Sequence, residues 1–409
     1  MVSNGHNFLL DLAGSGFFLL ILVHLPRQAF SGRSLPLGFG QPPEALCAAA
    51  INSLGYKCQE FEAITDDGYI LSVQRIPEGR AGGRGGGSDR PPVLLQHGVI
   101  VDGMSWLLNS PDEALPLILA DNGFDVWISN TRGTRYSRRH LTLDPAKQEY
   151  WNWTWDELVI HDLSTVADLV FNQTAQKIHY VGHSLGTLVV LAAFSEGKLS
   201  DRIKSAALLS PIAYLSHMTT ALGVVAAKAF VGEAVSILGL SEFNPKGVQE
   251  ELFMKALCDN PGVNCYDLLT ALTGNNCCLN KSTIDIALKN EPQSTSTKNL
   301  IHLSQTVRDA KLSKYDYGSA QMNIEHYGAP DPPVYDLSKI SGDIPLLLSY
   351  GGRDALSDVQ DVEDLLDALK LDKSLQVQYV KNYAHVDFVL GVTAKDLIFN
   401  RVMSFFRNQ

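Results

Sequence analysis

One serine of the chain stands in a pattern that nucleophilic catalysis requires. Residues 182–186 read Gly-His-Ser-Leu-Gly. An apolar stretch at 178–181 precedes Ser184, and a second apolar stretch at 185–195 follows it. This order favours a strand, a tight turn and a helix, which together project a serine hydroxyl above a sheet. The short motif also occurs by chance, so the apolar context is what makes Ser184 a candidate nucleophile.

A serine hydroxyl needs a base to remove its proton and an acid to orient that base. Behind such a turn the acid and then the base follow along the chain. Asp354 comes after the apolar stretch 344–350, and His385 comes after the stretch 375–380. Both places are where a parallel sheet presents its active edge. Asp358 stays a second candidate for the acid, but Asp354 is preferred because it lies nearer to the strand end.

Among the 11 histidines, His385 is the one with the right place in this order. His302 and His326 fall in a later insertion, and His161 is expected on a helix. His183 lies inside the turn, where it could brace the turn but is too close in sequence to reach the serine hydroxyl well.

The oxyanion of an ester intermediate needs two N–H donors. We expect one to be the backbone N–H of Leu185, directly after the nucleophile. The second is expected from the loop after an early strand, at residues 97–99, where we choose the N–H of Val99. The alternative is that this loop is a plain turn.

The stretches around these residues alternate between strands and helices. A hairpin with an Asp-Asp-Gly turn is predicted over 61–73, and residues 79–88 are expected to form a Gly- and Arg-rich surface loop. Further strands are predicted at 93–95, 124–129, 178–181, 205–210, 344–350 and 375–380, and helices at 155–171, 185–195, 362–371 and 393–406. This order predicts an α/β fold, a mainly parallel sheet with helices on both faces.

The alternation of strands and helices stops between residues 212 and 335. The sequence there has helical patterns and no clear buried strand. The predicted organisation is a signal peptide at 1–31, a core at 32–211, a helical cap or lid at 212–335, and the rest of the core at 336–409. Within the cap, residues 220–240 are mostly apolar. They are expected either to adsorb to a lipid surface or to pack on the core.

The net charge and the absence of certain motifs exclude several classes of binding partner and cofactor. The chain has 409 residues and a formal net charge of −11, which argues against nucleic acid or an anionic membrane surface. A neutral lipid–water interface stays possible. The sequence has no H-E-x-x-H metal motif and no glycine-rich phosphate loop after a strand, so no cofactor is expected.

The first residues predict entry into the secretory pathway. The apolar core 16–23 is followed by small residues at 29–31, and it is too short to span a membrane. Glycosylation sequons begin at Asn152, Asn172 and Asn280. Six cysteines favour disulfides in an oxidising compartment, with the pairing left open. The product is expected to be secreted, or kept in a vacuole or lysosome.

Taken together, the motifs resemble the acid lipase family of gastric and lysosomal lipases, from about Leu46 to the C-terminus. The motifs that carry the resemblance lie at 96–98, 130–133, 137–139, 155–157, 182–186, 351–354 and 385–388. The family usually has Leu where Val99 stands, residues 79–88 look like an extra insertion, and the cysteines of the cap do not overlay.

The resemblance implies an α/β-hydrolase fold with a helical cap, and hydrolysis of triacylglycerols or sterol esters at mildly acidic pH. Carried over by motif, it assigns Ser184 as nucleophile, Asp354 as acid and His385 as base, with Val99 and Leu185 as oxyanion donors. The alternatives are a carboxylesterase or acyltransferase acting on smaller esters, and a binding protein that keeps the fold. The binding protein would be expected to lack part of the triad.

Overall fold

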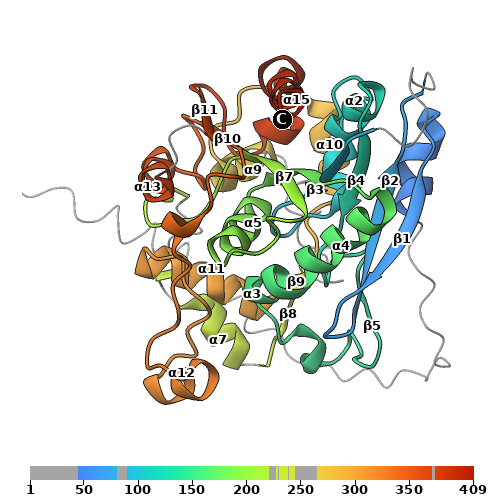
Figure 1. The fold of residues 1–409 in the computed structure, drawn as a ribbon. Helices are drawn as coiled ribbons and strands as arrows, with labels where there is room; N and C mark the ends of the chain where they lie inside the picture. Colours follow the sequence, from blue (N-terminus) through green and yellow to red (C-terminus); the bar gives the residue numbers. More distant parts are fainter. Residues whose placement is uncertain are drawn as a thin grey trace, which may run out of the picture. The chain divides into compact units, whose positions relative to one another are not determined.

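A mixed sheet of nine strands forms the centre of the part of the chain that the structure describes (Figure 1). The structure is a computed structural model that describes residues 45–80, 90–220, 227–228, 230–237, 239–244, 265–370 and 374–409. The strands of the sheet are β1 (Gln59–Ile64), β2 (Tyr69–Ile76), β3 (Pro92–Gln96), β4 (Asp125–Ser129), β5 (Arg139–His140), β6 (Ile178–His183), β7 (Ile203–Leu209), β10 (Leu346–Gly351) and β11 (Leu375–Val380).

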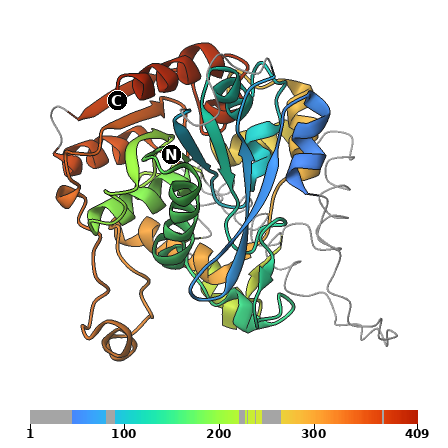
Figure 2. The same cartoon turned by 45° about the vertical axis from the view of Figure 1, so that its right-hand side comes forward.

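The strands lie in the order β1-β2-β4-β3-β6-β7-β10-β11, and β5 pairs with β2. β2 pairs antiparallel with β1 and with β4, whereas the pairs from β4 through β11 are parallel. In Figure 2 the hairpin of β1 and β2 runs along one edge of the sheet. The predicted hairpin and the predicted mainly parallel sheet are therefore confirmed.

Helices cover both faces of the sheet, as predicted. They are α4 (Leu163–Thr174), α5 (Leu185–Ser195) and α13 (Val359–Leu369) on one face, and α2 (Leu115–Asp121) and α15 (Asn400–Arg407) on the other. In β6, Tyr180 joins the first apolar core and Val181 joins the second, because successive side chains of a strand point to opposite faces. With both faces covered, every residue of β3, β4, β6 and β10 is buried.

The continuous helix expected over 155–171 is interrupted. α3 (Trp155–Glu157) is followed by a π-helical turn, η5 (Leu158–Asp162), before α4 begins. Asp162, at the end of this turn, accepts a hydrogen bond from Nε of the buried Arg132 at 2.8 Å. A π turn adds one residue to the helical repeat. Apolar periodicity alone did not reveal this local change.

The remaining short elements of the core lie between the strands or at the two ends of the sheet's sequence. They are η1 (Cys47–Ile51), η2 (Asn52–Leu54), η3 (Gly103–Leu107), η4 (Gln148–Trp151), η6 (Leu337–Lys339), α14 (Asp387–Leu390) and η7 (Lys395–Phe399). The helix expected over 393–406 therefore begins as the π-helical turn η7 and continues as α15.

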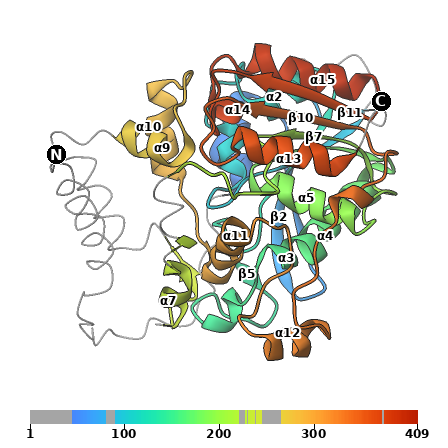
Figure 3. The same cartoon turned by 90° about the vertical axis from the view of Figure 1, so that its left-hand side faces the viewer.

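The residues from 212 to 335, which we call the insertion, leave the sheet after β7 and return before β10. Their described elements are α7 (Val231–Ile237), β8 (Glu242–Phe243), α9 (Cys265–Thr273), α10 (Lys281–Asn290), β9 (Thr295–Ser296), α11 (Thr297–Asp309) and α12 (Ala320–Tyr327). Figure 3 shows α7, α11 and α12 gathered at one end of the sheet. β8 and the buried β9 pair antiparallel, and this ladder was not predicted because two residues carry no periodic pattern.

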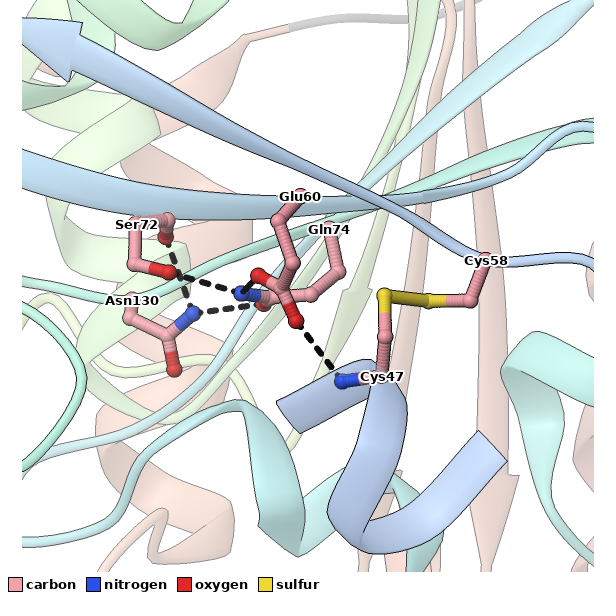
Figure 4. The surroundings of a disulfide bond; sticks show 6 residues. All are labelled: Cys47, Cys58, Glu60, Ser72, Gln74 and Asn130. Atoms are coloured by element: carbon pink, nitrogen blue, oxygen red, sulfur yellow. Dashed lines mark hydrogen bonds between the residues drawn. A yellow bond between two sulfur atoms is a disulfide. The ribbon is translucent and has the colours of Figure 1, made fainter. Parts of the chain in front are cut away.

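A disulfide between Cys47 and Cys58 ties η1 to the start of β1 (Figure 4). Glu60 accepts hydrogen bonds from the backbone N–H of Cys47 at 2.7 Å and from Nε2 of Gln74 at 2.6 Å. Asn130 in turn donates to Oε1 of Gln74 at 2.8 Å. This partly buried network connects the disulfide to the hairpin and to the loop after β4.

Some predicted features lie outside the described residues. They are the signal peptide at 1–31, most of the loop at 79–88, and Cys258. The described cysteines form a second disulfide, between the neighbours Cys277 and Cys278. None of the described helices is long and apolar enough to cross a membrane.

Candidate active site

Ser184 stands in a sharp turn between β6 and α5. Its backbone has φ 53° and ψ −121°, a region that residues with a side chain rarely adopt. The glycines of the motif are needed because the chain is crowded here. A Cβ on Gly182 would lie 2.8 Å from the carbonyl group of Gly186, and a Cβ on Gly186 would lie 2.5 Å from the carbonyl oxygen of Gln96. The predicted strand, turn and helix are all present.

The structure brings Asp354 and His385 together. Nδ1 of His385 lies 3.0 Å from Oδ2 and 3.1 Å from Oδ1 of Asp354, and both side chains are buried. Asp354 Oδ1 also accepts the backbone N–H groups of Leu356 at 2.9 Å and Ser357 at 2.8 Å. These contacts hold the carboxylate and favour the proton of the imidazole on Nδ1. The other ring nitrogen, Nε2, is then the one able to accept a proton.

The two candidate acids have different surroundings. Asp358 is the N-cap of α13, and its side chain accepts the backbone N–H of Gln360 at 2.9 Å. It therefore satisfies an N–H at the start of a helix. Asp354 is the carboxylate that contacts the imidazole, which favours it as the acid, and this assignment stays a prediction.

His183 contacts both the backbone and the ring of His385, and the two ring centroids lie 4.8 Å apart. Nε2 of His183 lies 2.9 Å from the carbonyl oxygen of His385, and Oγ of Ser210 donates to the same oxygen at 3.3 Å. Burial, with a smaller contribution from the charge of His385, lowers the pKa of His183 to about 3. His183 is therefore neutral over the ordinary pH range. It serves as a fixed partner of the turn that bears His385.

The loop after β3 passes directly beside the serine. A Cβ on Gly98 would lie 3.0 Å from Cβ and 3.4 Å from Oγ of Ser184. His97 shapes this loop, because its Nε2 accepts the backbone N–H of Thr131 at 3.1 Å and its Nδ1 lies 2.8 Å from the carbonyl oxygen of Gly98. Val99 is the residue that follows. The loop is thus built by specific contacts.

Leu185, the other expected oxyanion donor, is the first residue of α5. The first N–H groups of a helix have no partner within the helix, and they point toward its N-terminal end. The assignment of Val99 and Leu185 as the two donors stays a prediction.

The insertion, expected as a helical cap over the site, touches the same group of residues through particular contacts that were not predicted. The backbone N–H of His385 donates to the carbonyl oxygen of Thr273 at 3.1 Å, and Gly274 forms an antiparallel bridge with Asp354. These contacts use backbone groups that every residue carries, so no sequence signal marks them.

Asp387 is a further residue that was not assigned a role. It lies two residues after His385 in a motif that carried the family resemblance. Its buried carboxylate accepts the backbone N–H groups of Ala384, Cys277 and Cys278. The motif could have marked Asp387 as important, but its partners in the insertion could not be read from the sequence.

Three groups of described side chains are close enough together to hold a metal ion. They are Cys277 with Cys278 and Asp387, Asp66 with Asp67 and His161, and His217 with Asp361 and Asp364. Protein partners already engage each group: a disulfide joins the cysteines, Arg132 pairs with Asp67, and His217 lies 2.9 Å from Asp361. We assign no metal to them, and the expectation that no cofactor is needed stays a prediction.

Comparisons with known proteins identify the family and the fold of the chain. The model of the partial alpha/beta-hydrolase lipase region matches residues 47–110, and the model of the alpha/beta hydrolase fold matches residues 91–391. The chain is 58% identical to triacylglycerol lipase 2 of Arabidopsis thaliana over 96% of this chain and 95% of that protein. It is 34% identical to gastric triacylglycerol lipase of Homo sapiens over 86% of this chain and 88% of that protein.

A solved structure is also similar. A soluble variant of monoglyceride lipase from Saccharomyces cerevisiae, in complex with a substrate analogue, superposes with a TM-score of 0.53 at 13% identity. The match covers 86% of this chain and 94% of that chain. At this identity the similarity supports the fold.

Proposed function

The chain belongs to the acid lipase family of α/β-hydrolases, and we propose that it hydrolyses the carboxylic ester bonds of neutral lipids, triacylglycerols or sterol esters. The observation that carries the proposal is the hydrogen-bonded pair of Asp354 and His385, at the ends of two strands beside the strained turn of Ser184. We assign Ser184 as nucleophile, His385 as base and Asp354 as the acid that orients it.

The proposed reaction is acyl transfer in two steps. Oγ of Ser184 attacks the ester carbonyl carbon while Nε2 of His385 takes its proton. The N–H groups of Val99 and Leu185 stabilise the oxyanion. The protonated His385 then gives its proton to the leaving alcohol. Water attacks the acyl-enzyme in the same way and releases the fatty acid.

We propose that the insertion acts as a cap, because Ser184 is hardly accessible from solvent. The side chain of Ser184 is 6% exposed, and Thr273 and Gly274 lie against the neighbouring Asp354 and His385. These contacts support a role for the insertion in controlling access of a lipid to the serine. We propose that the insertion opens at a lipid–water interface.

An apolar surface on the insertion supports adsorption to lipid. Four of the exposed large apolar residues of the insertion lie between residues 230 and 243, namely Phe230 at 53%, Ile237 at 85%, Leu240 at 54% and Phe243 at 40%. They fall within or just after the apolar stretch 220–240. Exposed apolar area of this kind is unfavourable in water and favourable at a neutral lipid surface. We call these four residues the apolar patch.

We further propose that the protein enters the secretory pathway and is secreted or retained in a vacuole or lysosome. The apolar leader at 16–23 and the Cys47–Cys58 disulfide support this location. The sequon residues Asn152, Asn172 and Asn280 are all exposed, as glycosylation requires.

The test is release of fatty acid from emulsified triacylglycerol and from sterol ester between acidic and mildly alkaline pH, with wild type and Ser184→Ala. We expect wild type to act on the emulsion, with an optimum on the acidic side, and the variant to lose activity by at least about 1,000-fold. Activity restricted to short soluble esters would favour a carboxylesterase. Acyl transfer to an added alcohol in excess water would favour an acyltransferase, and equal rates in the two proteins would refute the assignment of Ser184.

A further inference from the structure

Asp387 is a buried carboxylate with an unusual set of partners. Its side chain is fully buried, and it begins α14 two residues after His385. Oδ2 accepts the backbone N–H of Ala384 at 2.8 Å, from the turn that bears the imidazole. The same carboxylate accepts two N–H groups from the insertion, so it contacts both sides of the boundary between them.

The two donors in the insertion are consecutive residues. The N–H of Cys277 donates to Oδ2 and the N–H of Cys278 donates to Oδ1, each at 3.1 Å. Two neighbouring N–H groups of an extended chain point to opposite sides, so binding one carboxylate requires a bent backbone. The disulfide between Cys277 and Cys278 joins the side chains of these two residues and restricts their backbone.

Flanking contacts extend the boundary on both sides. Leu279 forms an antiparallel bridge with Gly391, and the N–H of Val392 donates to the carbonyl oxygen of Cys278 at 2.8 Å. On the other side, the backbone N–H of His385 donates to the carbonyl oxygen of Thr273. Backbone contacts therefore join the turn that bears His385 to the insertion on both sides of Asp387. Asp387 is the ionisable side chain between these contacts.

We propose that Asp387 is a positioning residue that fixes the turn bearing His385 against the insertion, and that the Cys277–Cys278 disulfide holds the two N–H groups that Asp387 binds. This inference rests on the proposed function, because it assigns the base role to His385. Asp387 does not touch the reacting atoms. It acts by keeping the imidazole in the position where it can take the proton of Ser184.

The physical reason is the free energy lost when a buried polar group has no hydrogen-bond partner. A buried carboxylate is costly unless hydrogen bonds satisfy it, and three N–H donors do so here. Replacing it with an amide puts an NH2 group against N–H donors, so at least one contact becomes repulsive. We expect this to displace the turn and misplace the base, and small displacements of catalytic groups lower rates strongly.

The test compares Asp387→Asn with wild type on a soluble p-nitrophenyl ester, which avoids interface effects. We expect kcat to fall by about tenfold or more while KM stays within about twofold, since the change acts on the base and not on the substrate site. A p-nitrophenyl phosphonate that labels the serine gives a second readout. The final extent of labelling counts intact sites, and its rate constant reports how well the base assists Ser184. We expect an unchanged extent and a reduced rate constant.

The matched variant is Cys277→Ser/Cys278→Ser. It removes the disulfide between the two residues whose N–H groups Asp387 binds. If the cysteine pair acts through Asp387, adding this change to Asp387→Asn slows labelling no further, and the combined effects are non-additive. The control is Cys47→Ser/Cys58→Ser, which removes the other described disulfide. It is expected to lower the Tm while leaving the labelling rate constant per intact site unchanged.

The labelling rate constants of the variants either support or overturn the role of Asp387. A labelling rate constant in Asp387→Asn equal to that of wild type overturns it, and so do multiplicative effects of the two sets of changes. If Asp387→Asn does not fold, the cysteine variant decides alone: a rate within about twofold of wild type overturns the proposal, and a several-fold fall supports it. Failure of the phosphonate to label wild type at Ser184 would instead refute the proposed function.

Discussion

Gly274 of the insertion and Asp354 of the core are joined by an antiparallel β-bridge, which places the insertion against the carboxylate that hydrogen-bonds His385. The adjacent Thr273 accepts the backbone N–H groups of His385 at 3.1 Å and Ala355 at 3.4 Å. The position of the insertion and the placement of Asp354 beside His385 therefore depend on the same contacts.

Gly274→Ala tests this dependence. Gly274 has φ +95°, and a Cβ there would lie 2.1 Å from the carbonyl oxygen of Arg353. We expect the methyl group to separate the insertion from Asp354, lowering the Tm and the activity on a soluble ester. Gly318→Ala is the control, because Gly318 has φ +83° and a Cβ there would meet no atom within 4 Å. The control should show only the conformational cost, about 1 kcal/mol of unfolding free energy. Equal losses in both variants would contradict the role of the bridge.

Asp354→Asn and Asp358→Asn separate the two carboxylates. The first change removes the charge that holds the Nδ1–H tautomer of His385, so kcat should fall by about 1,000- to 10,000-fold. The second should leave activity unchanged, since asparagine caps a helix about as well as aspartate. The measurement is steady-state hydrolysis of a soluble ester, with circular dichroism to confirm folding. A large loss in Asp358→Asn alone would reverse the assignment.

Asp156 predicts a pH-dependent contribution to stability. Its buried carboxyl contacts the hydroxyl of Tyr335 at 2.6 Å and the N–H of Tyr315 at 3.0 Å, and burial raises its pKa from 3.8 to about 7. A pKa raised on folding gives stability that is full below about pH 4 and is lost as the pH rises through about 7. Asp156→Asn imitates the protonated carboxyl, because its amide can donate to Tyr335 and accept from Tyr315.

The measurement is the free energy of unfolding of wild type and Asp156→Asn between pH 5 and pH 8. We expect the stability of wild type relative to the variant to decrease across this range. The difference between the two proteins is the useful quantity, because His302 works in the opposite direction. Burial lowers the pKa of His302 to about 3, so its contribution is lost as the pH falls. A difference that does not change with pH would show that Asp156 is ionised throughout.

Ile237→Asp tests the apolar patch. Ile237 is 85% exposed, so a charge there should leave folding and hydrolysis of a soluble ester unchanged. Hydrolysis of emulsified triacylglycerol should fall several-fold, because a carboxylate opposes entry into an apolar surface. The matched control is Ile64→Asp, since Ile64 is 53% exposed on the edge strand β1. Equal activity of the two variants on emulsions would show that the patch does not bind lipid.

The sequence by itself determined the features that depend on local pattern. The apolar runs around Ser184 fix a strand and a helix, and the glycines at 182 and 186 allow the close approach that the turn requires. The alternation of strands and helices was enough to predict the covered parallel sheet. The order of Ser184, Asp354 and His385 along the chain was likewise sufficient to nominate all three residues.

Tertiary structure alone decided which distant groups meet. Asp354 and Asp358 are four residues apart with similar surroundings in sequence, and the contact with His385 distinguishes them. The docking of Thr273 on the turn of His385, and the binding of the Cys277 N–H by Asp387, left no trace in the pattern. The reason is physical: every residue except proline carries the same backbone donor and acceptor, so their partners depend on the folded path of the chain.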